Sequence, residues 1–369
     1  MLVLAEDIGS RPAGTSPERQ AADYISQQLT TYGYEIQVQE FTFGYYVEEA
    51  PVLEMVGPTP LSLNPRALRF SAGGDVIAEL VPAGLGRPQD FPPEGLKGRI
   101  ALIERGDLSF SDKVANAAAA GAAAVVIYNN VEGPLRGDLQ DESTIPALSL
   151  SQAEGGQLQT LMAEGPLTVH LFAQSAWETR TSQNVIGRPP QDDCQFIVGA
   201  HYDSVAAGPG ANDNASGSAT LLEMARVLDL RDQDEGVCFV AFGAEEVGLI
   251  GSRHFVATLT SQGQALPQAM VNLDMVGVGD EWQLMGSVGL AERIDQGAAA
   301  LGLDPVQAEP RQDSDHISFM EAGIPAILIY RFEDPHYHTE SDRAEFVDPQ
   351  LLEEAAELAF LALAEQAGS

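Results

Sequence analysis

The sequence has 369 residues, a length that allows two or three domains, and 44% of them are hydrophobic, as in ordinary globular proteins. Acidic residues number 54 against 19 basic ones, which gives a net charge of −35. A surface of this charge repels phosphate backbones and argues against nucleic-acid binding; it favours either solubility or the attraction of cationic substrates.

Membrane and secretion signals are not expected. The longest apolar stretch, residues 117–128, is shorter than the about 18 residues of a spanning helix, and Gly121 interrupts it. Residues 1–5 lack the basic start and cleavage pattern of a signal peptide, which suggests a cytosolic chain or one that was trimmed. Cys194 and Cys238 have no CxxC spacing; we expect buried free thiols, with a cross-strand disulfide as the alternative.

The first elements are a helix and a strand. Residues 16–32 place Ser16 at the cap and Pro17 at the first helical position, and Gly33 ends the segment, so we predict a helix there. Residues 36–43 alternate apolar and polar side chains, which indicates a half-buried strand.

The character of the chain then changes. Residues 47–177 contain one histidine, His170, and no acidic residues at ligand spacing. Their pattern predicts one alanine-rich helix that ends at Gly121 and short strands that include residues 76–81, 100–103 and 124–128. We therefore expect a smaller, β-rich α+β module inserted into a larger domain.

From residue 184 onward, strands and helices alternate. Compact apolar runs predict strands over residues 196–200, 237–243, 269–273 and 325–330. Helical patterns cover residues 218–229, 248–259, 291–301 and 349–366. This order predicts an α/β fold with a mainly parallel central sheet and helices on both faces.

Metal-binding residue types follow these strands. Ligands of such sheets bind beyond the carboxyl ends of the strands, where the sequence places five candidate ligands: His201, Asp213, Glu246, Asp274 and His338. Imidazole and carboxylate groups suit zinc, and five of them fit two ions that share one carboxylate. We expect the loop residue Asp213 to be the shared ligand.

The residues beside these ligands suggest further roles. Glu245 adjoins Glu246 and cannot easily face the same ion, so it is the candidate general base. Tyr337 could donate a hydrogen bond to a developing oxyanion. We expect the Asp203 and Asp342 carboxylates to orient the two imidazoles. Asp315 and His316 either line the pocket or follow a helix cap at Ser314 or Asp315.

Taken one at a time, these residues have ordinary explanations, such as loop polarity, a solvated helix start or an Asx turn. The ordered set, with a member at each strand end, favours a metal centre. The sequence has no HExxH, GxSxG or GxxxxGK[ST] motif, which argues against single-zinc helical proteases, serine hydrolases and P-loop enzymes.

At this point the residues resemble a known family. HYDSVAAGPGANDNASG, FGAEEVGLIGSRHF, NLDMVG, SDHISF and YHTESD, in that order, resemble the co-catalytic zinc aminopeptidases of the aminopeptidase S and aminopeptidase Y type. With the early GSRPAGTSPERQAADYI, this resemblance covers residues 1–46 and 178–369. The stretch GLKGRIALIERGDLSFSDKVANAAAAGAAAVVIYNN, followed by IPALSLS, resembles an inserted protease-associated domain, residues 47–177.

The resemblance implies a zinc exopeptidase fold with two Zn²⁺ ions. One ion would take His201, Asp213 and Asp274, and the other Asp213, Glu246 and His338. Glu245 would be the general base for a hydroxide between the ions, Tyr337 would donate to the oxyanion, and the Asp213–Asn214 bond would be cis. Substrates would be peptides or proteins with a free N-terminus and an apolar first residue. Relatives are commonly exported to the cell envelope or medium.

Three alternatives stay open at this level. Glutaminyl cyclases share the fold and similar ligands but use one zinc. Glutamate carboxypeptidase relatives keep two zincs and need a basic pocket for a terminal carboxylate, which the scarcity of basic residues disfavours. A receptor-like scaffold, as in transferrin receptor relatives, would have lost ligands, whereas all five positions are intact here.

Overall fold

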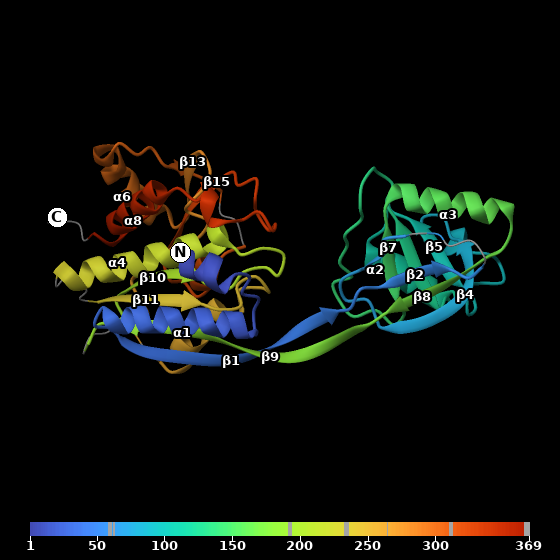
Figure 1. The fold of residues 1–369 in the computed structure, drawn as a ribbon, viewed down its shortest axis with the longest axis horizontal. Coiled ribbons are helices and arrows are strands. Elements are labelled where there is room, and N and C mark those ends of the chain that lie inside the picture. The colour runs from blue at the N-terminus through green and yellow to red at the C-terminus, as the bar shows by residue number, and fades with distance from the viewer. Residues whose placement is uncertain are drawn as a thin grey trace. The chain divides into compact units, whose positions relative to one another are not determined.

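The computed structural model describes residues 1–57, 61, 63–190, 194–231, 236–263, 265–309 and 313–364. The chain forms two compact units: Met1–Phe43 together with Thr179–Ser369, and Gly44–Glu178. The long strands β1 (Glu35–Glu48) and β9 (Ser175–Arg188) lead the chain out of the first unit and back into it (Figure 1). No helix in the described ranges combines the length and hydrophobicity needed to cross a membrane.

The first unit is built on an eight-stranded mixed sheet in the order β1-β9-β11-β10-β12-β15-β13-β14. Its centre is parallel, because β10 pairs in parallel with β11 and β12, and β12 with β15. The antiparallel pairs β11–β9 and β15–β13 flank this centre. The remaining strands are β10 (Phe196–His201), β11 (Val237–Phe242), β12 (Ala269–Leu273), β13 (Glu281–Gly286), β14 (Val306–Gln307) and β15 (Ala326–Phe332). The predicted parallel-centred sheet is confirmed.

Helices cover both faces of this sheet, as predicted. Along β11, Phe239 and Ala241 belong to a core shared with α1 (Ser16–Thr31), α4 (Gly217–Arg231), α6 (Val288–Ala298) and α8 (Pro349–Leu363). The alternate residues Val240 and Phe242 pack with α5 (Ile250–Ser261) and α7 (His316–Glu321) on the other face. Since successive strand side chains point to opposite faces, one buried strand serves both cores.

Two local predictions in this unit are wrong. The cap of α1 is Thr15, whose hydroxyl accepts from the Glu18 backbone N–H, and Ser16 is already helical. Cys194 and Cys238 form a disulfide instead of remaining free thiols. Cys238 is the second residue of β11 and Cys194 lies just before β10, so the parallel pairing of these strands brings the two sulfurs together.

The second unit has its own seven-stranded sheet, in the order β2-β8-β4-β5-β6-β7-β3. Its strands are β2 (Val52–Met55), β3 (Arg66–Ala67), β4 (Gly74–Pro82), β5 (Ile100–Glu104), β6 (Ala124–Tyr128), β7 (Ala147–Leu150) and β8 (Leu167–Ala173). Leu158 of α3 (Gln152–Glu164) joins one core, and Val114 and Ala117 of α2 (Phe110–Ala119) join the other. The sequence pattern predicted α2 and missed α3.

Candidate metal centre

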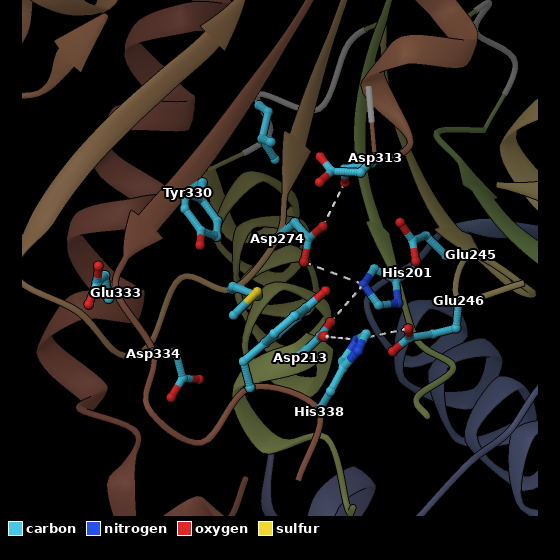
Figure 2. Close-up of a pocket in the computed structure, with 14 residues that line it drawn as sticks. His201, Asp213, Glu245, Glu246, Asp274, Asp313, Tyr330, Glu333, Asp334 and His338 are labelled. Atoms are coloured by element: carbon cyan, nitrogen blue, oxygen red, sulfur yellow. Dashed lines mark hydrogen bonds and ion pairs between the residues drawn. The ribbon is translucent and has the colours of Figure 1, made fainter. Parts of the chain in front are cut away.

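The predicted ligands meet at one edge of the first unit's sheet. His201 is the last residue of β10, Asp274 directly follows β12, and Glu246 lies in the loop after β11. His338 comes from the loop after β15, and Asp213 from the turn that leads into α4. Because β11, β10, β12 and β15 are adjacent and parallel, their carboxyl ends present these side chains to a common pocket (Figure 2).

One set of three ligands surrounds His201. Its Nε2 atom lies 3.2 Å from Asp213 Oδ1 and 3.3 Å from Asp274 Oδ1. All three residues are buried. Their potential ligand atoms lie within 4.8 Å of one another, which is close enough to hold one metal ion.

A second set shares Asp213. His338 Nε2 lies 3.1 Å from Asp213 Oδ2 and 3.1 Å from Glu246 Oε2. Asp213 thus directs one carboxylate oxygen toward each histidine (Figure 2). Within the described ranges, these two sets are the groups of three or more His, Cys, Asp or Glu residues able to hold a metal.

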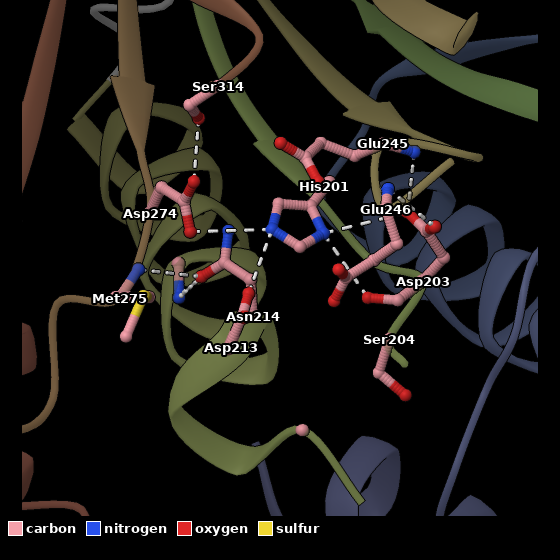
Figure 3. Close-up of polar contacts among 12 residues, drawn as sticks. His201, Asp203, Ser204, Asp213, Asn214, Glu245, Glu246, Asp274, Met275 and Ser314 are labelled. Carbon is pink, nitrogen blue, oxygen red and sulfur yellow. Dashed lines mark hydrogen bonds and ion pairs between the residues drawn. The ribbon is translucent and has the colours of Figure 1, made fainter. Parts of the chain in front are cut away.

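The donor sets fit zinc. Two ligands about 2.1 Å from a tetrahedral ion lie about 3.4 Å apart, close to the 3.1–3.3 Å between the nitrogen and oxygen atoms here. Ser314 Oγ donates to Asp274 Oδ2 at 2.6 Å, whereas the buried Asp274 Oδ1 accepts no hydrogen bond and faces His201 Nε2 at 3.3 Å (Figure 3). That oxygen therefore keeps its lone pairs for a cation.

The excess of carboxylate groups in the cluster also favours the binding of cations. Burial alone would lower the pKa of His338, but its hydrogen bonds to Asp213 and Glu246 raise that pKa to about 10. Burial and the charge of Asp213 raise the pKa of Glu246 to about 7. Carboxylates crowd this site beyond what two imidazolium rings neutralise, and two divalent ions would supply the missing charge.

Glu245 lies beside the ligand sets but belongs to neither. It lines the same pocket and is 8% exposed, and burial raises the pKa of its carboxyl well above the ordinary value. The Asp203 carboxylate accepts hydrogen bonds from the backbone N–H groups of Glu245 at 3.1 Å and Glu246 at 3.3 Å (Figure 3). The loop after β11 thus places a carboxyl group that belongs to neither ligand set next to the candidate cation site.

The two acidic residues expected to orient the imidazoles act differently from each other. His201 Nδ1 lies 3.2 Å from the Asp203 carbonyl oxygen and 3.5 Å from its carboxylate, so Asp203 does contact the ring. Asp342 instead accepts from the backbone N–H groups of Asn212 and Asp213, at 2.7 and 3.1 Å. The prediction that Asp342 orients the His338 ring is wrong. Its carboxylate instead binds the backbone of the loop that carries the shared ligand Asp213.

Asp315 and His316 do not line the pocket, contrary to one expectation. Both are completely buried, and their side-chain polar atoms have no hydrogen-bond partner among the described residues. The alternative of a side-chain cap also fails, because Asp315 precedes α7 without capping it and the Ser314 hydroxyl binds Asp274. The short helix turns both side chains inward.

The peptide bond between Asp213 and Asn214 is cis, which confirms the implication of the resemblance. The Asn214 side chain fixes this turn to the neighbouring strand: its Nδ2 donates to the Leu273 carbonyl at 2.9 Å, and its Oδ1 accepts from the Met275 backbone N–H at 3.3 Å. The shared ligand is thereby tied to the segment that carries Asp274.

The pocket at this edge has a volume of about 310 Å³. Tyr337 lines it, as expected, and its ring stacks on His338 with the ring centroids 3.8 Å apart. Sequence reasoning missed seven further lining residues: Met275, Asp313, Ser314, Leu328, Tyr330, Glu333 and Asp334. The alternation along the predicted strand at 325–330 could have indicated that Leu328 and Tyr330 share a face.

Comparisons with known proteins find relatives of both units of the chain. Residues 184–363 match peptidase family M28, and residues 76–158 match the PA domain. Aminopeptidase YwaD of Bacillus subtilis is 35% identical over 98% of this chain and 82% of its own length. Leucine aminopeptidase 2 of Arthroderma otae is 35% identical over 86% of this chain and 68% of its own length.

A solved structure is similar over the whole chain. The zinc aminopeptidase BSAP from Bacillus subtilis is 33% identical, with a TM-score of 0.78, and the match covers 100% of this chain and 94% of that one. Sequence family, overall structure and the positions of the metal-binding side chains lead to one conclusion: this chain belongs to peptidase family M28 and contains a PA domain.

Proposed function

We propose that this chain is a zinc-dependent aminopeptidase that removes N-terminal residues from peptides and proteins. One zinc would be held by His201, Asp213 and Asp274, and a second by Asp213, Glu246 and His338. The observation that carries the proposal is the pair of ligand sets joined by one carboxylate, with the free acid Glu245 beside them.

Glu245 has the position of a general base. When bound, two zinc ions would acidify a water molecule and polarise the scissile carbonyl group. The Glu245 carboxylate would take the proton from the attacking water and then pass it to the amine that leaves. Its burial beside the ligand sets excludes bulk water from this proton transfer.

Tyr337 would stabilise negative charge on the reacting carbonyl oxygen. Its hydroxyl can donate a hydrogen bond as that oxygen becomes an oxyanion. The residue lines the pocket, its ring stacks on His338, and it is 47% exposed. Solvent and substrate can therefore reach this side chain.

The charge of the pocket favours the amino end of a substrate. Besides the proposed ligands and Glu245, three carboxylates line it: Asp313, Glu333 and Asp334. Among its described lining residues there is no arginine or lysine that could pair with a C-terminal carboxylate. This argues for an aminopeptidase over a carboxypeptidase of the same fold.

The preference for an apolar first residue rests on one wall of the pocket. Met275, Leu328 and Tyr330 line the pocket and belong to one small apolar cluster. Burying an apolar side chain against them would remove its surface from water, at about 25 cal/mol per Å². The relative named leucine aminopeptidase 2 supports the same preference.

We also propose which unit forms which domain. Residues 1–46 and 178–369 would form the catalytic domain, and residues 47–177 the protease-associated domain. The first assignment is supported by the location of both ligand sets. The second is supported by the PA match at residues 76–158, within the unit Gly44–Glu178.

A panel of aminoacyl amides tests the function directly. We expect hydrolysis of leucyl amide, no hydrolysis after N-acetylation, loss of activity on chelation and recovery with added zinc. Cyclisation of glutaminyl amide, or cleavage of peptides only from a free C-terminus, would instead support one of the other activities of this fold. Inactivity on every substrate with zinc fully bound would support a non-catalytic scaffold.

A further inference from the structure

A second buried acidic residue, Glu18, packs against the end of β11, just before the loop that carries Glu245. Glu18, the third residue of α1, is 1% exposed. Its Oε2 atom accepts from the Gly14 backbone N–H at 2.7 Å, and its Oε1 atom accepts from the Ser182 hydroxyl at 2.5 Å. The backbone N–H of Ala244 also faces this carboxyl group. One carboxyl group thus joins three segments that are distant in sequence.

The contact with Ala244 matters because this residue directly precedes Glu245. Ala244 has a φ of 55°, a left-handed conformation that a side chain rarely adopts and that needs support from its surroundings. At Gly243, an added Cβ would lie 2.4 Å from Ser182 Oγ and 2.9 Å from Glu18 Oε1. The end of β11 therefore packs directly onto the Glu18–Ser182 pair.

The position of the Glu245 carboxylate depends on this backbone. Within the described ranges no side-chain or backbone donor forms a hydrogen bond to that carboxylate. Asp203 holds the N–H groups of Glu245 and Glu246, and Glu18 packs against the two preceding residues, Gly243 and Ala244. Two buried acids consequently support the main chain on both sides of Glu245.

We infer that Glu18 is a positioning residue for catalysis, which sets the backbone at Ala244 and thereby the place of the Glu245 carboxylate. This inference rests on the proposed role of Glu245 as general base. A displacement of a reacting group by about 1 Å can cost about 100-fold in rate. Loss of the Ala244 contact should therefore lower kcat. Zinc should still bind, because Asp203 continues to hold the N–H of the ligand Glu246 and the other four ligands come from other segments.

Four variants test this role in the full-length protein. Glu18→Ala should lower kcat for leucyl amide by about 10- to 100-fold, with KM and zinc content within about twofold of the parent. Glu18→Gln keeps the side-chain length and a carbonyl acceptor, so it should restore kcat to within about fivefold of the parent. Leu29→Ala, a buried substitution farther along α1, should lower Tm and leave kcat unchanged. Glu18→Asp, which withdraws the carboxylate by one methylene group, should lower kcat to an intermediate level and decides the test if Glu18→Ala does not fold.

Hydrogen exchange supplies a readout that needs neither metal nor turnover. In the zinc-free protein, the amides of residues 244–246 should exchange faster in Glu18→Ala than in the parent, and at the parental rate in Leu29→Ala. Parental kcat in Glu18→Ala or Glu18→Asp, or an equal loss in Leu29→Ala, would overturn the inference. An inactive parent would instead refute the proposed function, so the two failures are distinguishable.

Discussion

The two units have the same layered construction and differ at the ends of their strands. Each contains adjacent parallel strands with helices on both faces of the sheet. In the first unit, the strand ends present imidazoles and carboxylates. In the second, β6 and β7 are followed by Asn129, which accepts a hydrogen bond from Arg105, and Ser151, which caps α3. The comparison teaches that the side chains at the strand ends carry the chemistry, and the architecture alone does not.

Each unit has a buried basic residue that donates to backbone carbonyl groups near strand ends. In the first unit, Arg11 donates to the carbonyl oxygens of Tyr202 at 2.8 Å and Gly210 at 3.0 Å, next to the segments that carry His201 and Asp213. In the second, Lys113 donates to the carbonyls of Leu85 at 2.6 Å and Glu104 at 2.9 Å. Because both units support their loops in this same way, they differ mainly in the side chains that follow their strands.

The largest expected effect comes from changing the proposed base. Glu245→Gln should lower kcat by about 100- to 10,000-fold, because an amide cannot accept the proton, and should leave the zinc content unchanged. The adjacent Glu246→Gln is the matched control and should reduce zinc content, since it removes a ligand. Parental kcat in Glu245→Gln would eliminate this residue as the base.

The disulfide should have the next largest effect, on stability and only in the first unit. The bond closes a loop with a sequence separation of 44 residues, and restricting the unfolded chain in this way stabilises by about 4 kcal/mol. A double replacement, Cys194→Ser with Cys238→Ser, should lower Tm by about 10 °C. Both cysteines lie at the amino ends of strands, opposite the pocket, so kcat at 25 °C should be unchanged.

Hydrogen exchange can locate this loss of stability. The second unit contains no cysteine, so amides in its β5 and β6 should keep their protection in the double variant. Equal loss of protection in both units would show that they unfold together and would contradict a local effect.

The smallest expected effect is at the histidine of the second unit. His170 Nε2 lies 2.8 Å from Asp75 Oδ1 in a solvent-accessible pair that belongs to neither ligand set. His170→Ala should therefore leave zinc content and kcat unchanged and alter stability by less than about 1 kcal/mol. A loss of zinc in this variant would show that metal binding is not confined to the first unit.

The central sheet and the five candidate ligands could be predicted from sequence because their signals are local. Short runs of apolar residues identified β10, β11, β12 and β15. An expected ligand follows directly after the runs of β10 and β12, and lies in the loop after the runs of β11 and β15. Parallel pairing then brings those positions together whatever the details of packing. This is why His201 and Asp274, 73 positions apart in the sequence, could be expected in one metal centre, and the family resemblance then implied that they share one ion.

Features that depend on rotation or pairing could not be predicted. Asp315 and His316 follow a loop, and the direction of the short helix α7 decides whether they face the pocket or the core. The Asp342 contact with the loop of Asp213 and the Cys194–Cys238 bond both depend on which segments become neighbours. Helix α3 begins at a clear cap, Ser151, but Gly155 and Gly156 weaken its helical pattern.

The zinc content of the purified chain tests the central claim most directly. Elemental analysis of the parent and of Asp213→Ala should give two zinc ions per chain for the parent and a loss of zinc in the variant, because the shared carboxylate serves both sets. A single zinc in the parent, or two zincs retained in Asp213→Ala, would contradict a centre in which Asp213 joins two metal ions.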